Sequence, residues 1–366
     1  MGRYLLRRLF WMPLVLLVLV TLSFFIMRLA PGGPFTAERN LPPEIEQALN
    51  EKYGLDDPMP LQFARYVGNA LQGDLGPSTK FKDRTVNQII ADHIGPTAVI
   101  GIGATVIALV LGLVAGVIGA VRQNSVFDYA SMSVAMFGMS VPTFVTGPLL
   151  VLAFALYWKV FPVSGYAVTL EWWPALALLG LYGVWRVVEW ARGGAWPGGP
   201  NFDPGREVGA FWTAALASAF VLVLVMLVRN ETLVLPAVVL ALPFASRIAR
   251  LMRAGMLEVI RQDYIRTAYA KGLPAGTVIV RHALKGGVLP VVSYLGPAMA
   301  SLLTGSLVVE KIFAVPGIGR EFVESALNRD YWMALGTVVL YGTLLVLFNL
   351  LVDIAYGYLD PRIRYD

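Results

Sequence analysis

The sequence predicts an all-α integral membrane protein: a polytopic helical bundle of about eight transmembrane helices with a small extracytoplasmic helical subdomain. Composition is the first reason, because 57% of the 366 residues are hydrophobic and only 14% are charged, unlike ordinary soluble proteins. Apolar runs long enough to cross a bilayer, roughly 20 residues in a helix, recur along the chain. Lysine and arginine gather in a few segments between these runs.

Eight apolar segments are the predicted spans. The first is expected to be a retained anchor, because its apolar run exceeds a signal-peptide core and Arg28 stands near the place of a small-residue cleavage site. The sixth contains Pro236 and Pro243, and we expect a kinked helix inside the bundle, where neighbours satisfy the freed backbone groups. The segments are Leu9 to Ala30, Thr97 to Val121, Tyr129 to Tyr157, Trp172 to Trp190, Gly209 to Val228, Thr232 to Leu251, Gly286 to Ile312 and Met333 to Leu359.

Basic residues predict the orientation. With the N-terminus in the cytoplasm, the cytoplasmic segments contain 16 of the 29 lysines and arginines, eight of them between Arg247 and Lys285. Such an excess marks the cytoplasmic side of a membrane protein. Because the number of spans is even, both termini are predicted to be cytoplasmic.

The residue counts exclude several kinds of chemistry. The chain has no cysteine, so disulfides, thiolate metal sites and cysteine nucleophiles are ruled out. His93 and His282 are its two histidines, and their wide separation argues against a histidine-based metal or acid–base site. The pattern G-x-x-x-x-G-K-[ST] does not occur, so we expect no ATP phosphate loop. We predict that this chain is not an enzyme, holds no cofactor or metal and binds no nucleic acid.

Between the first two spans, residues 31–96 are the predicted extracytoplasmic subdomain. A proline pair precedes the helix Glu44 to Tyr53, whose apolar side chains share one face, and Gly54 ends it. A second short helix is expected from Leu61 to Leu71. The subdomain has no binding signature of its own, so a structural cap over the bundle mouth and a contact with a partner protein both remain open.

The segment from Asp263 to Pro290 is polar, basic and interrupted by glycine and proline between two apolar spans. The helical pattern from Met252 to Lys271 is closed by Gly272, since glycine favours the position just past a helix end. Pro274 then stands where a new helix would begin. Two short helices that meet at a bend are expected, and such a surface favours docking of another protein over catalysis.

Small residues carry two further hypotheses. In the third span Ser140, Pro142 and Gly147 could form a kink that lines a passage, or a kink of structural importance alone. In the second span glycines recur at near-helical spacing, which predicts close helix packing rather than a role in a passage. These glycines are Gly101, Gly103, Gly112, Gly116 and Gly119.

Motifs along the chain occur in a characteristic order. They are LAPGGP (29–34), KYGLDDPMPLQF (52–63), RTAYAKGL (266–273), RHALKGGVLPVV (281–292), VPGIGRE (315–321) and NLLVDIAYGYLDPRIRY (349–365). Together they resemble the B-type permease subunit of dipeptide, oligopeptide and nickel ABC importers. The resemblance covers residues 1–157 and 232–366, and residues 165–231 form an added segment with two spans, for which packing in the membrane and contact with another subunit both remain open.

The resemblance implies a type I importer permease in the plasma (inner) membrane of a prokaryote, surrounded by membrane lipids. Such a subunit pairs with a homologous C-type permease and receives substrate from an extracytoplasmic binding protein. Two cytoplasmic ATPase subunits, which hold ATP and Mg, drive it. In this reading residues 97–366 are the permease domain.

The family's cytoplasmic coupling loop carries a Glu-Ala-Ala motif followed by glycine, and its helices sit in grooves of the ATPases. Here the loop is 252–285, and Arg266 replaces the acidic residue, so the ion-pair details do not carry over. Ala268 is expected on the face that enters the groove. The implied docking residues are Arg266, Thr267, Ala268, Ala270, Lys271, Gly272 and Leu273.

Three alternatives to peptide import are nickel or small-solute import, secondary transport and membrane-bound catalysis. Nickel or another small solute is disfavoured because no cysteine or histidine cluster occurs in the spans. A secondary transporter would show internal repeats and acids or bases at the membrane centre, whereas Asp353 of the eighth span lies close to its inner end. A membrane enzyme would need clustered catalytic groups.

Overall fold

The computed structural model describes residues 2–29, 47, 50–51, 54–81, 83–165 and 230–359. In this part of the chain the ordered elements are helices, with one isolated antiparallel bridge between Pro77 and Thr85. The elements in the candidate membrane spans are α1 (Gly2–Leu29), α4 (Val86–Val121), α5 (Val126–Ser140), α6 (Thr143–Leu150), the π-helix η1 (Val151–Tyr157), α9 (Glu231–Ile260), α13 (Leu289–Leu303), α14 (Leu307–Ile312) and α16 (Tyr331–Leu359). The elements outside these spans are α3 (Met59–Leu71), α10 (Asp263–Ala270), α11 (Ala275–Thr277), the π-helix η2 (Val278–Ala283), α12 (Leu284–Gly287) and α15 (Ile318–Leu327).

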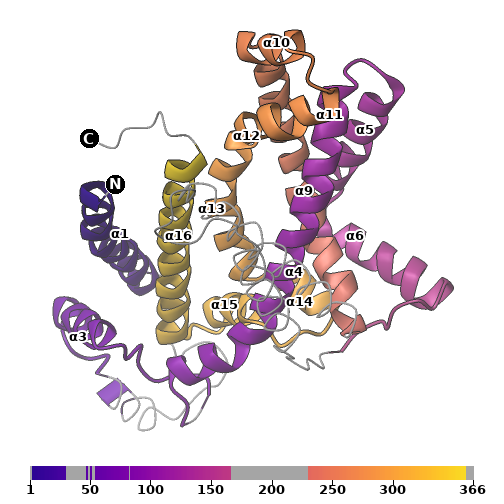
Figure 1. Ribbon diagram of the computed structural model, residues 1–366. Helices are drawn as coiled ribbons and strands as arrows, with labels where there is room; N and C mark the ends of the chain where they lie inside the picture. Colours follow the sequence, from indigo (N-terminus) through magenta and orange to yellow (C-terminus); the bar gives the residue numbers. More distant parts are fainter. Residues whose placement is uncertain are drawn as a thin grey trace, which may run out of the picture.

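The short helices gather at two opposite ends of the bundle (Figure 1). At one end α10, α11 and α12 lie near the turn that joins α4 to α5, and we call this the α10 end. At the other end lie α3 and α15, and we call it the α3 end. The long helices α4, α9, α13 and α16 run between the two ends.

Among the described residues, five helical segments are long and apolar enough to cross a membrane, and α5 with α6 and η1 forms a bent sixth candidate. They coincide with the first, second, third, sixth, seventh and eighth predicted spans. Large apolar side chains on them are exposed, such as Phe10 and Val134, as expected of a surface that faces lipid. The predicted spans Trp172 to Trp190 and Gly209 to Val228 lie outside the described residues.

The central helix is α9, which packs along α4. Leu233, Ile248, Met252 and Met256 of α9 are fully buried, and α9 runs without interruption through both of its prolines. The expected place of the sixth span inside the bundle is therefore confirmed. An apolar helix buried on most of its surface is typical of the core of a membrane bundle.

Glycines of α4 permit this close packing. A Cβ atom at Gly112 would stand 2.6 Å from Cβ of Ile248, and one at Gly116 would stand 2.5 Å from Cβ of Met252. At Gly101 it would stand 2.6 Å from the carbonyl oxygen of Leu302 in α13. The predicted packing role of these three glycines is confirmed, because any side chain would push the helices apart.

The second span begins earlier than predicted. Helix α4 starts at Val86 rather than at Thr97, and Pro96 lies inside it. The reason is a capping box, in which the hydroxyl of Thr85 accepts from the Gln88 amide and the Gln88 side chain accepts from the Thr85 amide. The segment before this span therefore ends at Thr85.

Within that segment, the predicted short helix from Leu61 to Leu71 is confirmed as α3. Its buried Tyr66 joins Val20 and Phe24 of α1 and Leu335 of α16 in one apolar cluster. This cluster fixes α3 against the end of the bundle. The predicted helix Glu44 to Tyr53 lies largely outside the described residues.

Candidate functional site

The predicted helix from Met252 to Lys271 is in fact two helices. Helix α9 ends at Ile260, Gln262 is extended with a ψ of 152°, and α10 begins at Asp263. The acidic side chain in the first turn favours a new start, because it complements the positive end of the helix dipole. The docking segment is therefore a separate helix at the α10 end (Figure 1).

Helix α10 has an inward and an outward face. Ile265 and Ala268, three residues apart, are 1% and 7% exposed and belong to the main core with Val278. Tyr264 and Tyr269 flank this buried face and are 43% and 45% exposed, and the opposite face carries the exposed Arg266, Thr267 and Ala270. The expectation that Ala268 enters a partner's groove is therefore wrong, because its methyl group is already covered by this chain.

The remaining predicted docking residues are mostly accessible. The side chain of Arg266 is 76% exposed and lies 3.6 Å from Asp263, which is 95% exposed. Leu273 is partly buried against the main core. The exposed members of the set are Arg266, Thr267, Ala270, Lys271 and Gly272.

Gly272 ends α10 as predicted. Its φ is +79°, in the left-handed region, and its amide donates to the carbonyl of Tyr269 at 2.9 Å. No atom lies within 4 Å of the position that a Cβ would take. The left-handed backbone conformation, and not a lack of space, therefore favours glycine at this position. Pro274 then precedes α11 with a ψ of 145°. The predicted bend between two short helices is confirmed.

Close backbone contact holds this segment to the core. A Cβ atom at Gly255 of α9 would stand 2.4 Å from the carbonyl oxygen of Gly287 in α12. One at Gly287 would stand 2.6 Å from Sδ of Met256. A movement of α12 toward α9 is therefore opposed by direct backbone contact. Sequence reasoning missed this contact, although Gly287 lies in the motif RHALKGGVLPVV (281–292).

Sequence reasoning also missed a second contact, which is an ion pair between α5 and α9. Arg253 donates from Nε and Nη2 to the two carboxylate oxygens of Asp128, at 2.8 and 2.7 Å. Asp128 is 2% exposed and also accepts from the amide of Asn124 at 3.0 Å. A bidentate pair of this kind fixes orientation as well as distance. The turn between α4 and α5 is thereby held to the helix that leads to α10.

The third span is broken at the predicted place. Helices α5 and α6 meet at Val141 and Pro142, and the pair is bent by 107°. Ser140 and Pro142 are exposed at the bend. Gly147 is buried, and a Cβ there would stand 3.0 Å from Cδ1 of Ile312 in α14. The kink is real, and Gly147 packs against a neighbouring helix.

At the α3 end, the VPGIGRE motif folds around a buried carboxylate. Glu310, 2% exposed, accepts from the hydroxyl of Thr97 at 2.9 Å and from the amide of Arg320 at 2.8 Å. The amide of Ile318 donates to the same hydroxyl at 2.9 Å. A Cβ at Gly317 would stand 2.3 Å from Cδ of Glu310. The motif therefore packs against α4 at Thr97, inside the helix rather than at its start, a role that the sequence reasoning did not assign.

Comparison with known proteins places these features in one family. The model of the binding-protein-dependent transport system inner membrane component matches residues 108–195 and 208–365, and the N-terminal model of the same kind of component matches residues 1–80. Only residues 196–207 separate the first two matched stretches, so the match includes most of the 165–231 segment.

Three curated relatives illustrate the likeness. The oligopeptide transport system permease protein OppB of Escherichia coli (strain K12) is 40% identical over 365 residues, with 100% of each chain covered. OppB of Salmonella typhimurium is 41% identical with the same coverage. The dipeptide transport system permease protein DppB of Bacillus subtilis is 38% identical over 364 residues, covering 100% of this chain and 98% of the relative. The chain therefore belongs to the family of binding-protein-dependent transport system inner membrane components.

Proposed function

We propose that this chain is the transmembrane permease subunit of an ATP-driven peptide importer and forms one half of its translocation pathway. The full-length similarity to permeases named for oligopeptide and dipeptide transport carries the proposal. Its partners are a homologous C-type permease, two cytoplasmic ATPase subunits and an extracytoplasmic substrate-binding protein. ATP and Mg are bound by the ATPase subunits, and this chain contributes no catalytic group.

The ATPase contact is the outward face of α10 and the turn that follows it. This surface presents Arg266, Thr267, Ala270, Lys271 and Gly272, all exposed. Because the opposite face of α10 is covered by the core, the helix is fixed to the rest of the chain when a partner binds its exposed face.

Movement of α10 reaches the membrane through two contacts. Ile265 anchors α10 in the core, and Gly287 of α12 rests on α9. Reversal of a 1:99 equilibrium between inward and outward openings takes roughly 5.5 kcal/mol of differential interaction. ATP-driven closure of the ATPases supplies it as a rigid-body displacement of the docked segment. Ser140 and Pro142, at the bend of the third span, are the proposed lining of the passage.

The α10 end is the cytoplasmic side in this proposal. The concentration of basic residues between Arg247 and Lys285 supports that assignment. Helix α1 then begins on the cytoplasmic side and helix α16 ends there. The chain is thus a multi-pass inner membrane protein with both termini in the cytoplasm. The α3 end faces the binding protein.

Reconstitution in proteoliposomes tests the function. Uptake of a labelled oligopeptide is expected only when the second permease, both ATPases and the binding protein are present together with ATP. The isolated chain in detergent is expected to bind no nucleotide. Nucleotide binding by the chain alone, or ATP-independent peptide uptake, would contradict the proposal. Leaving out one subunit at a time is the matched control.

A further inference from the structure

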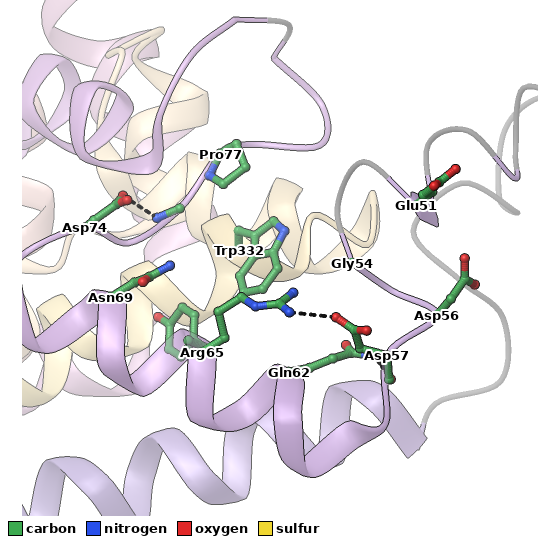
Figure 2. Close-up of a pocket in the computed structure, with 12 residues that line it drawn as sticks. Glu51, Gly54, Asp56, Asp57, Gln62, Arg65, Asn69, Asp74, Pro77 and Trp332 are labelled. Carbon is green, nitrogen blue, oxygen red and sulfur yellow. Dashed lines mark hydrogen bonds and ion pairs between the residues drawn. The ribbon is translucent and has the colours of Figure 1, made fainter.

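A pocket of about 420 Å³ lies at the α3 end, away from the proposed ATPase contact (Figure 2). It is formed by α3, the segment before α3, residues 74–77 and the side chain of Trp332 at the start of α16. Exposed Glu51 and Asp56 lie at its edge. Elements from distant parts of the sequence therefore build one concave site.

Two buried polar atoms in this pocket have no hydrogen-bond partner. Gln62 is 5% exposed, and its Nε2 donates to the carbonyls of Leu55 at 2.9 Å and Asp57 at 2.6 Å. These two bonds fix the orientation of the amide and leave Oε1 as an acceptor without a donor. The hydroxyl of Tyr66, 2% exposed, is also without a partner. Buried polar groups left unsatisfied are costly, so both atoms point to a ligand that donates hydrogen bonds.

The charge of the pocket is negative. Four carboxylate residues line it, Glu51, Asp56, Asp57 and Asp74, against the single cation of Arg65 among the described lining residues. Arg65 pairs with Asp57 at 2.8 Å (Figure 2). Three carboxylates therefore remain for a cation from outside the pocket.

An aromatic wall adds a third element. The rings of Tyr66 and Trp332 are stacked, with centroids 5.5 Å apart and planes inclined by 23°. Ring faces attract ammonium and guanidinium groups. Burial raises the pKa of the Tyr66 hydroxyl, so this group stays neutral and can accept a hydrogen bond from such a cation.

We propose that this pocket binds the ammonium or guanidinium head of a ligand that approaches from the α3 end. Its N–H donors meet Gln62 Oε1 and the Tyr66 hydroxyl, while the carboxylates supply the countercharge. The volume suits a basic side chain with its stem rather than a bare ion. In the described part of the chain, no group of three or more histidine and acidic side chains could hold a metal ion.

Methylguanidinium is the probe for the test, because it carries the head group without a stem. Saturation-transfer NMR would measure its binding to the purified full chain in detergent, with n-butanol as a neutral comparison. Tyr66→Phe removes the partnerless hydroxyl and nothing else, so thermal stability is expected to be retained while methylguanidinium binds roughly tenfold more weakly. Asp56→Asn, at an exposed position, is expected to weaken binding as well. Asp83→Asn is the control, since Asp83 is exposed in the same segment but does not line the pocket.

Two results would overturn the proposal, and two others would support it and identify the source of the head group. Equal binding to wild type, Tyr66→Phe and Asp56→Asn would show that neither group meets the cation. Displacement of methylguanidinium by millimolar CaCl₂ but not by NaCl of equal ionic strength would assign the pocket to a metal ion instead. Displacement by an arginine-containing tripeptide would identify a free peptide as the source of the head group. Displacement by the substrate-binding protein alone would identify a docking side chain, and either of these last two results supports the site. No step requires ATP or transport, so the outcome is independent of the proposed function.

Discussion

Gly272 offers a sharp test of the docking segment, because its backbone is left-handed and the space around it is open. Gly272→Ala should destabilise this turn by about 1–2 kcal/mol, because an L-residue is strained in the left-handed conformation. No steric cost is added, since nothing lies within 4 Å of the new methyl group. Gly276→Ala is the matched control: its Cβ also meets nothing within 4 Å, its φ is not positive, and it lies in α11.

The expected consequence is local opening of the turn rather than loss of the fold. At tenfold per 1.4 kcal/mol, the strain makes opening roughly 5- to 30-fold more favourable. The amides of Gly272 and Leu273, which bond to Tyr269 and Ala268, should exchange with deuterium faster by that factor. Gly276→Ala should leave this exchange unchanged or slow it, because alanine favours a helix by about 1 kcal/mol over glycine.

Hydrogen exchange of the purified chain, read by mass spectrometry on peptides covering residues 263–277, measures this difference. Co-purification of the ATPase subunits reports whether the strained turn still docks, and it should fall for Gly272→Ala alone. If both variants exchange at the wild-type rate, the left-handed turn is not a constraint and the reasoning fails. If both bind the ATPases like wild type, the turn is not part of the contact.

The remaining predictions concern packing, charge and topology. Ala268→Trp should destabilise the isolated chain by about 1–3 kcal/mol, because the larger side chain overpacks the core. Ala270→Trp should leave the melting temperature of the chain unchanged and reduce only ATPase co-purification. Equal melting temperatures for the two variants would mean that α10 is not anchored through Ala268. Asp128→Asn should lower thermal stability by about 1–3 kcal/mol, because a bidentate charged contact is weakened, and an unchanged melting temperature would show the pair to be dispensable. In sealed cells, Ser164→Cys should react with an impermeant thiol reagent and Gly276→Cys should not, while the reverse pattern would invert the proposed orientation.

Several features could be predicted from the sequence because they depend on neighbours along the chain. Six of the predicted spans correspond to long or bent helices of the described residues, since the length and composition of an apolar run are local properties. The end of α10 at Gly272 follows from the backbone freedom of one residue. The break before Pro142 agrees with a local rule, because the residue before a proline is disfavoured in a helix. Packing overrides the same rule at Pro96 in α4 and at Pro236 and Pro243 in α9, which lie inside continuous helices.

Other features were mistaken or missed for a common reason. The start of α4 was misplaced because its capping box precedes the apolar run and is only a weak signal in sequence. The face of α10 was misassigned because its mixed sequence does not say whether this chain or a partner covers Ala268. A small side chain suits both surroundings.

What the sequence by itself determined is the class of protein, the order of its spans and the place of the docking segment. The tertiary structure alone decided which residues meet: Asp128 with Arg253, 125 positions apart, and Thr97 with Glu310, 213 positions apart. It also built the acidic pocket from α3 and Trp332. Helix formation and membrane insertion depend on residues within a few turns, whereas buried polar pairs and pockets exist only after packing has brought distant segments together.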